Sequence, residues 1–318
     1  MNGEITGKNH TFANLTLFFL RFRIMNKIKI PVLFTFLMIA VYATAQTDLM
    51  YPMIQDSLSK LSSEIWKQKS DSSRLAVNEI FFWKFSGVLS APTSETYPFD
   101  SIQGITRVVS VDGKIRIFTW NVPINNGSNK YFGFIQVAGQ KKSLIQLISR
   151  ETDLPVNDDR QIDINNWYGA IYYKLIETET AGKTIYTLLG WDGYTANSNR
   201  KFIDILSFDE QGELQLGQPV FKTAQGTRSR IILEYAEKAN LLLRYDYQAL
   251  KVIKGKRVKL ENTWLLVMDR LVPMDPSMEG IRRYYVPSGD VYDGFVFRDG
   301  FWKLVEEIEI INNGSGSK

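Results

Sequence analysis

One short motif places an acid beside an aromatic ring, which is a combination suited to sugars. The motif is Gly190-Trp191-Asp192-Gly193. Two carboxyl groups, one protonated and one ionised, can hydrolyse a glycosidic bond, and Asp192 is the leading candidate for one of them. Its candidate partners are Asp204, Asp246, Asp269 and Asp293. The favoured alternative for Asp192 and Asp293, each followed by glycine, is a turn whose aspartate bonds nearby backbone amides. For Asp246, an ion pair with Arg244 is the plainer explanation.

Aromatic side chains offer a second chemistry, the stacking of a ligand on a ring face. The chain holds 7 Trp, 19 Phe and 15 Tyr. Trp167 and Tyr168 lie in a polar stretch and Trp191 in the expected turn, so these rings are candidates for exposure. Trp120 and Asn121 end an expected strand. The candidate ligand-binding residues are therefore Trp120, Asn121, Trp167, Tyr168, Trp191 and Asp192.

For any single tryptophan, burial in the core is the favoured alternative to ligand binding. Trp83, Trp264 and Trp302 lie among apolar neighbours, so the sequence predicts that these three are core residues.

Several common chemistries are excluded by residue type. The chain has no cysteine and one histidine, His10, in a segment expected to be removed. Ser-His-Asp and Cys-His catalysis and histidine- or thiolate-ligated metals therefore have no residues to use. No phosphate-binding loop motif is present, and Ser57-Leu-Ser-Lys60 lies within an expected amphipathic helix rather than at a helix start. We predict no cofactor and no nucleotide.

One cluster of oxygen-bearing side chains is dense enough to consider as a calcium site. Its members are Asn157, Asp158, Asp159, Asp163, Asn165 and Asn166. The cluster lacks the spacing and central glycine of the twelve-residue calcium loop. A solvated loop is therefore favoured, and no metal site is predicted.

Residues 25–45 have the three parts of a secretory signal peptide. A basic segment from Met25 to Lys29 precedes an apolar run of 13 residues, Ile30 to Tyr42, and then the small-x-small site Ala43-Thr44-Ala45. The run is short of a membrane span. We expect a start at Met25, cleavage after Ala45 and a periplasmic or secreted protein. An uncleaved anchor is the alternative, and the leader would then make the membrane contact.

Removing residues 1–45 changes the charge balance. The leader holds five of the 38 basic residues and one of the 34 acidic ones, which leaves 33 of each. A neutral chain offers no electrostatic attraction for nucleic acid or an anionic membrane. An exported chain without cysteine indicates a bacterial periplasm or exterior. Because the chain has no cysteine, its mature N-terminus has no residue to carry a lipid anchor.

The elements that position these residues fall into two parts. Residues 46–92 carry apolar residues at helical spacing and predict a helical hairpin. Its second helix is expected from Arg74 to Phe85, with Ser72 or Ser73 as the N-cap and with Gly87 and Pro92 ending it. Because this segment is dense in aromatic side chains, we expect the helix to be buried. Residues 93–311 predict an antiparallel β domain, and residues 312–318 a flexible tail.

Short strands and polar turns fill the β domain. Asp112-Gly113 and Asp299-Gly300 predict two-residue hairpin turns. Asp-Gly pairs do not recur at the spacing of a propeller blade, about 40–45 residues. The predicted fold is therefore mainly β, a large antiparallel meander in an irregular sheet, sandwich or barrel, preceded by the helical hairpin.

Seven stretches along the chain resemble an uncharacterised family of exported proteins of the Gram-negative envelope. They are Phe82-Trp-Lys-Phe-Ser86, Pro98-Phe-Asp100, Arg116-Ile-Phe-Thr-Trp-Asn121, Tyr131-Phe-Gly-Phe-Ile-Gln136, Tyr186-Thr-Leu-Leu-Gly-Trp-Asp-Gly193, Leu243-Arg-Tyr-Asp246 and Tyr292-Asp-Gly-Phe295. The resemblance covers most of the chain after the leader. It implies export and one compact unit, and it implies no activity, because that family has none assigned.

The sequence thus predicts an exported soluble envelope protein that acts as a binding or scaffolding module, with no catalysis inferred. Its expected partner is an envelope protein or a glycan. The alternative is a glycan-active hydrolase that uses paired carboxylates. A third hypothesis is a periplasmic assembly subunit, in which the helix of residues 74–89 would dock on a partner instead of on its own sheet.

Overall fold

The computed structural model describes residues 50–140, 144–150, 154–155, 159–254 and 257–308. The leader of residues 1–45 and the tail of residues 312–318 lie outside them. The chain divides into two compact units, Met1–Asp56 and Ser57–Lys318. Residues 50–56 of the first unit are helical. The second unit carries the fold described below, beginning with helical residues 57–67. Of the residues described, no helix is long and apolar enough to span a membrane.

The predicted fold class is confirmed. The described residues are mostly β, with 51% in strands and 21% helical, and they form two helices near the N-terminus and three sheets rich in antiparallel pairs. Within the described ranges these sheets are open and form no closed barrel.

Helix α2 (Asp71–Leu89) is longer at both ends than the sequence predicted. Its N-cap is Ser70, which exchanges capping hydrogen bonds with Ser73, so the expected caps at Ser72 and Ser73 were wrong. Gly87 lies inside the helix and does not end it, since a glycine weakens a helix without forbidding it. A short 3₁₀ helix, η1 (Pro92–Thr96), follows.

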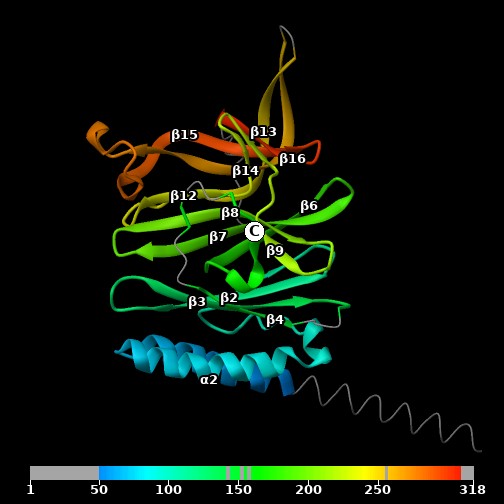
Figure 1. The fold of residues 1–318 in the computed structure, drawn as a ribbon, viewed down its shortest axis with the longest axis vertical. Coiled ribbons are helices and arrows are strands. Elements are labelled where there is room, and N and C mark those ends of the chain that lie inside the picture. The colour runs from blue at the N-terminus through cyan, green and yellow to red at the C-terminus, as the bar shows by residue number, and fades with distance from the viewer. Residues whose placement is uncertain (1–49, 141–143, 151–153, 156–158, 255–256, 309–318) are drawn as a thin grey trace, which may run out of the picture. The chain divides into compact units, whose positions relative to one another are not determined.

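Helix α2 packs on a sheet of its own chain, which is the opposite of what the assembly-subunit hypothesis expected. The sheet, sheet A, is a meander of β1 (Thr106–Val109), β2 (Ile115–Pro123), β3 (Asn129–Val137) and β4 (Leu144–Ile148). Phe81 and Phe85 pack against Trp120, with ring centroids 5.0 and 6.4 Å away. The buried Trp120 indole donates to Asn78 Oδ1 at 2.7 Å. Figure 1 shows helix α2 against sheet A.

Sheet B lies on the other face of sheet A. Its strand order is β5-β9-β8-β7-β6, and β12 also pairs with β8. The bounds are β5 (Ile162–Asp163), β6 (Ile171–Thr180), β7 (Lys183–Thr195), β8 (Ser198–Phe208), β9 (Leu214–Leu216) and β12 (Ile231–Ala236).

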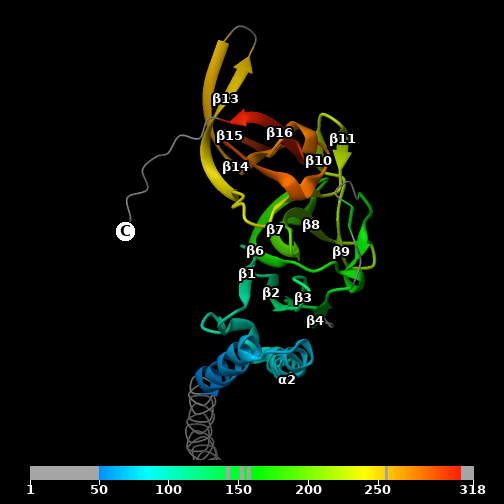
Figure 2. The same ribbon diagram turned by 90° about the vertical axis from the view of Figure 1, so that its left-hand side faces the viewer.

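Sheet C forms the last layer, with strand order β11-β10-β16-β15-β14-β13. All its pairs are antiparallel except β10 with β16. The bounds are β10 (Phe221–Thr223), β11 (Gly226–Arg228), β13 (Leu243–Lys254), β14 (Arg257–Pro273), β15 (Tyr285–Arg298) and β16 (Phe301–Ile308). Figures 1 and 2 show the sheets stacked in the order A, B, C.

Sheet B is covered on both faces because its strands alternate between two cores. In β8, Phe202 and Leu206 join the core shared with sheet A, whereas Ile203 and Ile205 join the core shared with sheet C. The side chains of β8 that face sheet A also include polar ones, and these lead to the candidate site.

Both predicted hairpins are present. Asp299 and Gly300 have φ of 55° and 78°, the paired positive values of a two-residue turn. Gly113 has φ of 71° in the connection from β1 to β2. That connection runs from Ser110 to Lys114, so it is longer than the two residues expected.

Candidate functional site

The candidate site is a pocket of about 480 Å³ between sheets A and B. Sheet A contributes Tyr131, from β3, and sheet B contributes Asp192 and Arg200, from β7 and β8. Tyr168, just before β6, stacks on Phe202 with ring centroids 4.8 Å apart, and both line the pocket. The pocket therefore combines hydrogen-bonding groups with flat aromatic rings.

Asp192 lies within strand β7, so its predicted place in a turn was wrong. The Tyr131 hydroxyl accepts a hydrogen bond from the Gly193 amide at 2.8 Å and donates one to the Asp192 carboxylate. Burial raises the pKa of Asp192 to about 6, against the lowering effects of Tyr131 and Arg200, while Glu234 adds to the rise. The pocket thus holds a carboxyl group whose charge changes near neutral pH.

Two side chains of sheet A form hydrogen bonds with the backbone carbonyl and the backbone amide of Gly193. Its carbonyl accepts from Asn129 Nδ2 at 2.8 Å, while its amide donates to Tyr131. Asn129 is in turn held by Asn121, whose Nδ2 donates to Asn129 Oδ1 at 2.7 Å. A Cβ atom at Gly193 would lie 2.7 Å from Asn129 Nδ2 and 2.8 Å from the Trp191 ring. Only glycine fits this contact without displacing a neighbour, so Gly193 sets the position of Asp192.

Arg200 faces Asp192 directly across the β7–β8 pair and faces Glu234 across the β8–β12 pair. Arg200 Nη2 lies 3.2 Å from Glu234 Oε2, and its Nη1 donates to the Leu154 carbonyl at 3.1 Å. The guanidinium carbon sits 3.3 Å from the centre of the Tyr194 ring. These contacts fix the guanidinium as a rigid part of the pocket wall.

A buried polar chain supports the floor of the pocket. The Tyr168 hydroxyl donates to Asp204 Oδ2 at 2.8 Å, and Arg230 Nε donates to the same oxygen at 3.0 Å. Burial raises the pKa of Tyr168 well above its usual value, so the hydroxyl keeps its proton and remains a donor. Trp167 Nε1 donates to the Tyr172 hydroxyl at 2.9 Å, which anchors the start of the same segment.

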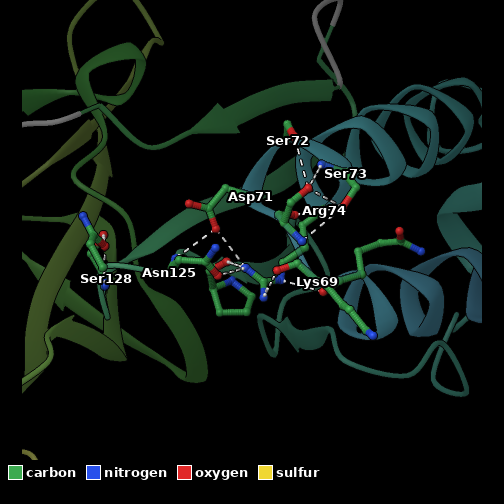
Figure 3. A network of polar contacts seen from close by, with 11 residues as sticks. Lys69, Asp71, Ser72, Ser73, Arg74, Asn125 and Ser128 are labelled. Carbon is green, nitrogen blue, oxygen red and sulfur yellow. Dashed lines mark hydrogen bonds and ion pairs between the residues drawn. The ribbon is translucent and has the colours of Figure 1, made fainter.

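The loop between β2 and β3 forms one rim of the pocket through Asn126 and Ser128. Figure 3 shows how the start of helix α2 holds this loop: Asp71 accepts from the Asn125 amide at 2.9 Å, and Arg74 Nη1 donates to Asn125 Oδ1 at 2.8 Å. At Gly127, with φ of 86°, a Cβ would lie 2.6 Å from the Cβ of Ala196 in the β7–β8 turn. The two loops therefore pack closely beside the site.

The six predicted site residues separate into three groups. Trp120 and Trp167 are 2% and 0% exposed and belong to cores, so the expected exposure of the Trp167 ring was wrong. Asp192 and Tyr168 line the pocket. Asn121 and Trp191 do not line the pocket. Asn121 donates a hydrogen bond to Asn129, which does line it, and the Trp191 ring lies beside Gly193.

Two of the three tryptophans predicted as core residues are on the surface. Trp83 and Trp264 are 58% and 52% exposed, because each lies on the outward side of an otherwise packed element, whereas Trp302 is fully buried as predicted.

The candidate partners of Asp192 do not meet it. Asp204 is fully buried in its ion pair with Arg230, below the floor. Asp246, Asp269 and Asp293 belong to strands of sheet C. Asp246 lies 2.9 Å from Arg244, as expected. Asp293-Gly294 lies within strand β15, so the predicted turn there was wrong.

In the cluster that was considered for calcium, the two described aspartates are bonded to protein groups. Asp159 accepts from the Ser229 amide and lies 3.0 Å from Arg228, and Asp163 accepts from the Asn165 amide. Asn157 and Asp158 lie outside the described residues. Among the residues that are described, no group of three or more His, Cys, Asp or Glu side chains could hold a metal ion.

Two important residues of the pocket were not predicted from the sequence. Arg200 had no simple signal, since counting outward from the Thr195–Ser198 pair places Lys201 opposite Asp192, and a register shift between Asp192 and Thr195 brings Arg200 there instead. Tyr131 had none, because it reaches Asp192 from a different sheet.

Comparison of the chain with protein-family models, curated proteins and solved structures finds no match. Any functional assignment therefore rests on the side chains of the pocket.

Proposed function

We propose that this protein is a non-catalytic binding module of the bacterial envelope that holds a glycan in the pocket between sheets A and B. The observation that carries the proposal is the pocket itself. Its volume of about 480 Å³ falls within the range of small-molecule sites, roughly 300–1,000 Å³. Its lining of amides, hydroxyls, one carboxyl, three cationic side chains and aromatic rings suits a ligand with many hydroxyl groups and an apolar ring face.

The absence of catalysis in this proposal follows from the residues available. Hydrolysis of a glycosidic bond needs two carboxyl groups on opposite sides of that bond. Among the described residues that line the pocket, Asp192 is the only carboxyl. Histidine and cysteine nucleophile chemistry has no residues in the chain after the leader.

A glycan hydrolase is the second candidate, because the raised pKa of Asp192, about 6, suits a general acid. The nearest second carboxyl by strand register is Glu234, two strands away across Arg200. In this alternative Glu234 would have to give up its ion pair with Arg200 to serve as the base.

The cellular setting of the proposal comes from the leader. Export would place the module in the periplasm or outside the cell, where envelope glycans and envelope proteins are the partners at hand.

A thermal-shift screen of the purified protein against neutral glycans tests the proposal. A ligand at 100 times its Kd adds about 2.7 kcal/mol to the free energy of unfolding, which is a shift of several degrees in Tm. We expect one glycan class to raise Tm and to remain intact on product analysis. Cleavage of that glycan, lost in Asp192→Asn, would support the hydrolase instead. No shift with any glycan would contradict both.

A further inference from the structure

The electrostatics of the pocket restrict the charge of the ligand. Lys130, Arg150 and Arg200 contribute cationic side chains to the lining, and Asp192 contributes the carboxyl. A cationic ligand would meet the guanidinium of Arg200, which already covers the Tyr194 ring. An anionic ligand would be attracted by Lys130 and Arg150, but a negative group placed beside the Asp192 carboxylate would be repelled in a partly desolvated site. A neutral, hydroxyl-rich group beside Asp192 and Arg200 avoids both costs.

The geometry around Asp192 shows how such a ligand would be held. A carboxylate has about four acceptor positions, and the Tyr131 hydroxyl occupies one of them. The clamp on Gly193 fixes the backbone next to the carboxylate, and Tyr131 fixes the carboxylate itself. A fixed carboxylate with open acceptor positions can take hydrogen bonds from two neighbouring hydroxyls, and these charge-assisted bonds are about twice as strong as neutral ones.

We propose that the ionised carboxylate of Asp192 accepts hydrogen bonds from two adjacent hydroxyls of a neutral sugar, and that the pocket releases this sugar when Asp192 takes up a proton. The inference rests on the proposed function and names its ligand class and its control. Protonation turns one carboxylate oxygen into a donor, removes the negative charge, and so weakens both bonds to the sugar.

Asp192 is the group that changes charge in the relevant pH range. The titratable and charged groups around it are Tyr131 on β3, Tyr194 on its own strand, Arg200 on β8, Glu234 on β12, and Lys130, Arg150 and Tyr168 along the remaining lining. Burial raises the pKa of the Tyr131 and Tyr168 hydroxyls, and Glu234 is ion-paired with Arg200. The pKa of Asp192, about 6, supports release below neutral pH.

Isothermal titration of the full protein between pH 5.0 and 7.5 tests this inference. The probes are cellobiose, maltose, mannobiose and galactobiose, which carry no titrating group, with galacturonic acid as the anionic comparison. With a pKa of about 6, the ionised fraction of Asp192 falls about tenfold between pH 7.5 and 5.0, so the affinity should fall by the same factor. We expect a neutral disaccharide to bind with that pH profile and galacturonic acid to bind more weakly.

Two variants complete the test. Asp192→Asn should lose at least about tenfold in affinity at pH 7.5, and its residual binding should not depend on pH. Asp290→Asn, which removes an exposed carboxyl on β15, should behave as the wild type. The wild-type pH series needs no variant, so it decides the matter even if Asp192→Asn folds poorly.

The failures are distinguishable. A disaccharide that binds equally at pH 5.0 and 7.5, or a stronger galacturonic acid complex, would overturn this inference and leave the proposed function standing. A failure of all five sugars to bind would overturn both.

Discussion

Asp204 Oδ2 lies 3.0 Å from Arg230 Nε, and neither side chain is accessible to solvent. The pair lies under the pocket, where Asp204 also accepts from the Tyr168 hydroxyl. Removing two charges from water is costly, and the cost is recovered only when the pair and its hydrogen bonds are complete. The position of the Tyr168 ring therefore depends on this buried ion pair remaining intact.

Removing one partner of this pair should be severely destabilising. Arg230→Met leaves the Asp204 carboxylate buried without its cation, and we expect a loss of about 3–5 kcal/mol in the free energy of unfolding, measured by urea denaturation. Arg244→Met breaks an exposed pair and should cost less than about 1 kcal/mol. Equal effects of the two substitutions would contradict the account of the pocket floor.

The clamp on Gly193 predicts that even one methyl group is too large there. Gly193→Ala should displace Asn129 or Trp191 and cost about 1–3 kcal/mol. Gly87→Ala is the matched control, because a methyl group at Gly87 would have no atom within 4 Å and alanine favours a helix, so it should stabilise by about 0.5–1 kcal/mol. Thermal denaturation of both variants checks the contrast. A neutral Gly193→Ala would show that the clamp is loose.

The raised pKa of Asp192 predicts a stability that depends on pH. The folded state holds the proton up to about pH 6, whereas the unfolded state releases it near pH 3.9, so the folded state binds more protons between these values. Stability should therefore fall as the pH rises from about 4 to 7, by about 3 kcal/mol from this group.

Asp192→Asn removes that dependence. The Tm of the variant should match the wild type near pH 4 and exceed it at pH 7.5, because the amide can still accept from Tyr131 without a buried charge. A Tm difference that stays constant over this range would show that Asp192 does not titrate as described.

A buried hydrogen bond between Asn78 and Trp120 contributes to the docking of helix α2 on sheet A. Asn78→Ala leaves the Trp120 indole N–H without its acceptor, and we expect a cost of about 1–3 kcal/mol. Glu79→Ala, at the exposed neighbouring position, should change stability by less than about 0.5 kcal/mol. Chemical denaturation of the pair measures the difference, and similar values would mean that the helix is held by its aromatic contacts alone.

Local signals in the sequence predicted the local parts of this fold. Asp299-Gly300 carries its own turn conformation, so the hairpin there depends on two neighbouring residues. Asp192-Gly193 has the same two letters and lies in a strand, because Tyr131 and Asn129 hold Gly193 from another sheet. A pattern of neighbouring residues in the sequence cannot reveal that contact, because it comes from a distant part of the chain.

Exposure was the hardest property to predict for the aromatic residues. Trp167 lies among polar neighbours in sequence and is fully buried, because Tyr172 supplies a partner for its N–H inside the core. Trp264 lies among apolar neighbours and is half exposed, stacked on Tyr245 at 5.0 Å. The layer order of the sheets, which decides both cases, is a property of distant contacts.

Binding of the protein to an array of neutral glycans at pH 7.5 tests the central claim most directly. The arms are the wild type, Asp192→Asn and Asp290→Asn, each shown beforehand to be folded. The account predicts one set of glycans bound by the wild type and by Asp290→Asn and lost or strongly reduced with Asp192→Asn. Equal binding by all three proteins, or no glycan bound by any of them, would contradict it.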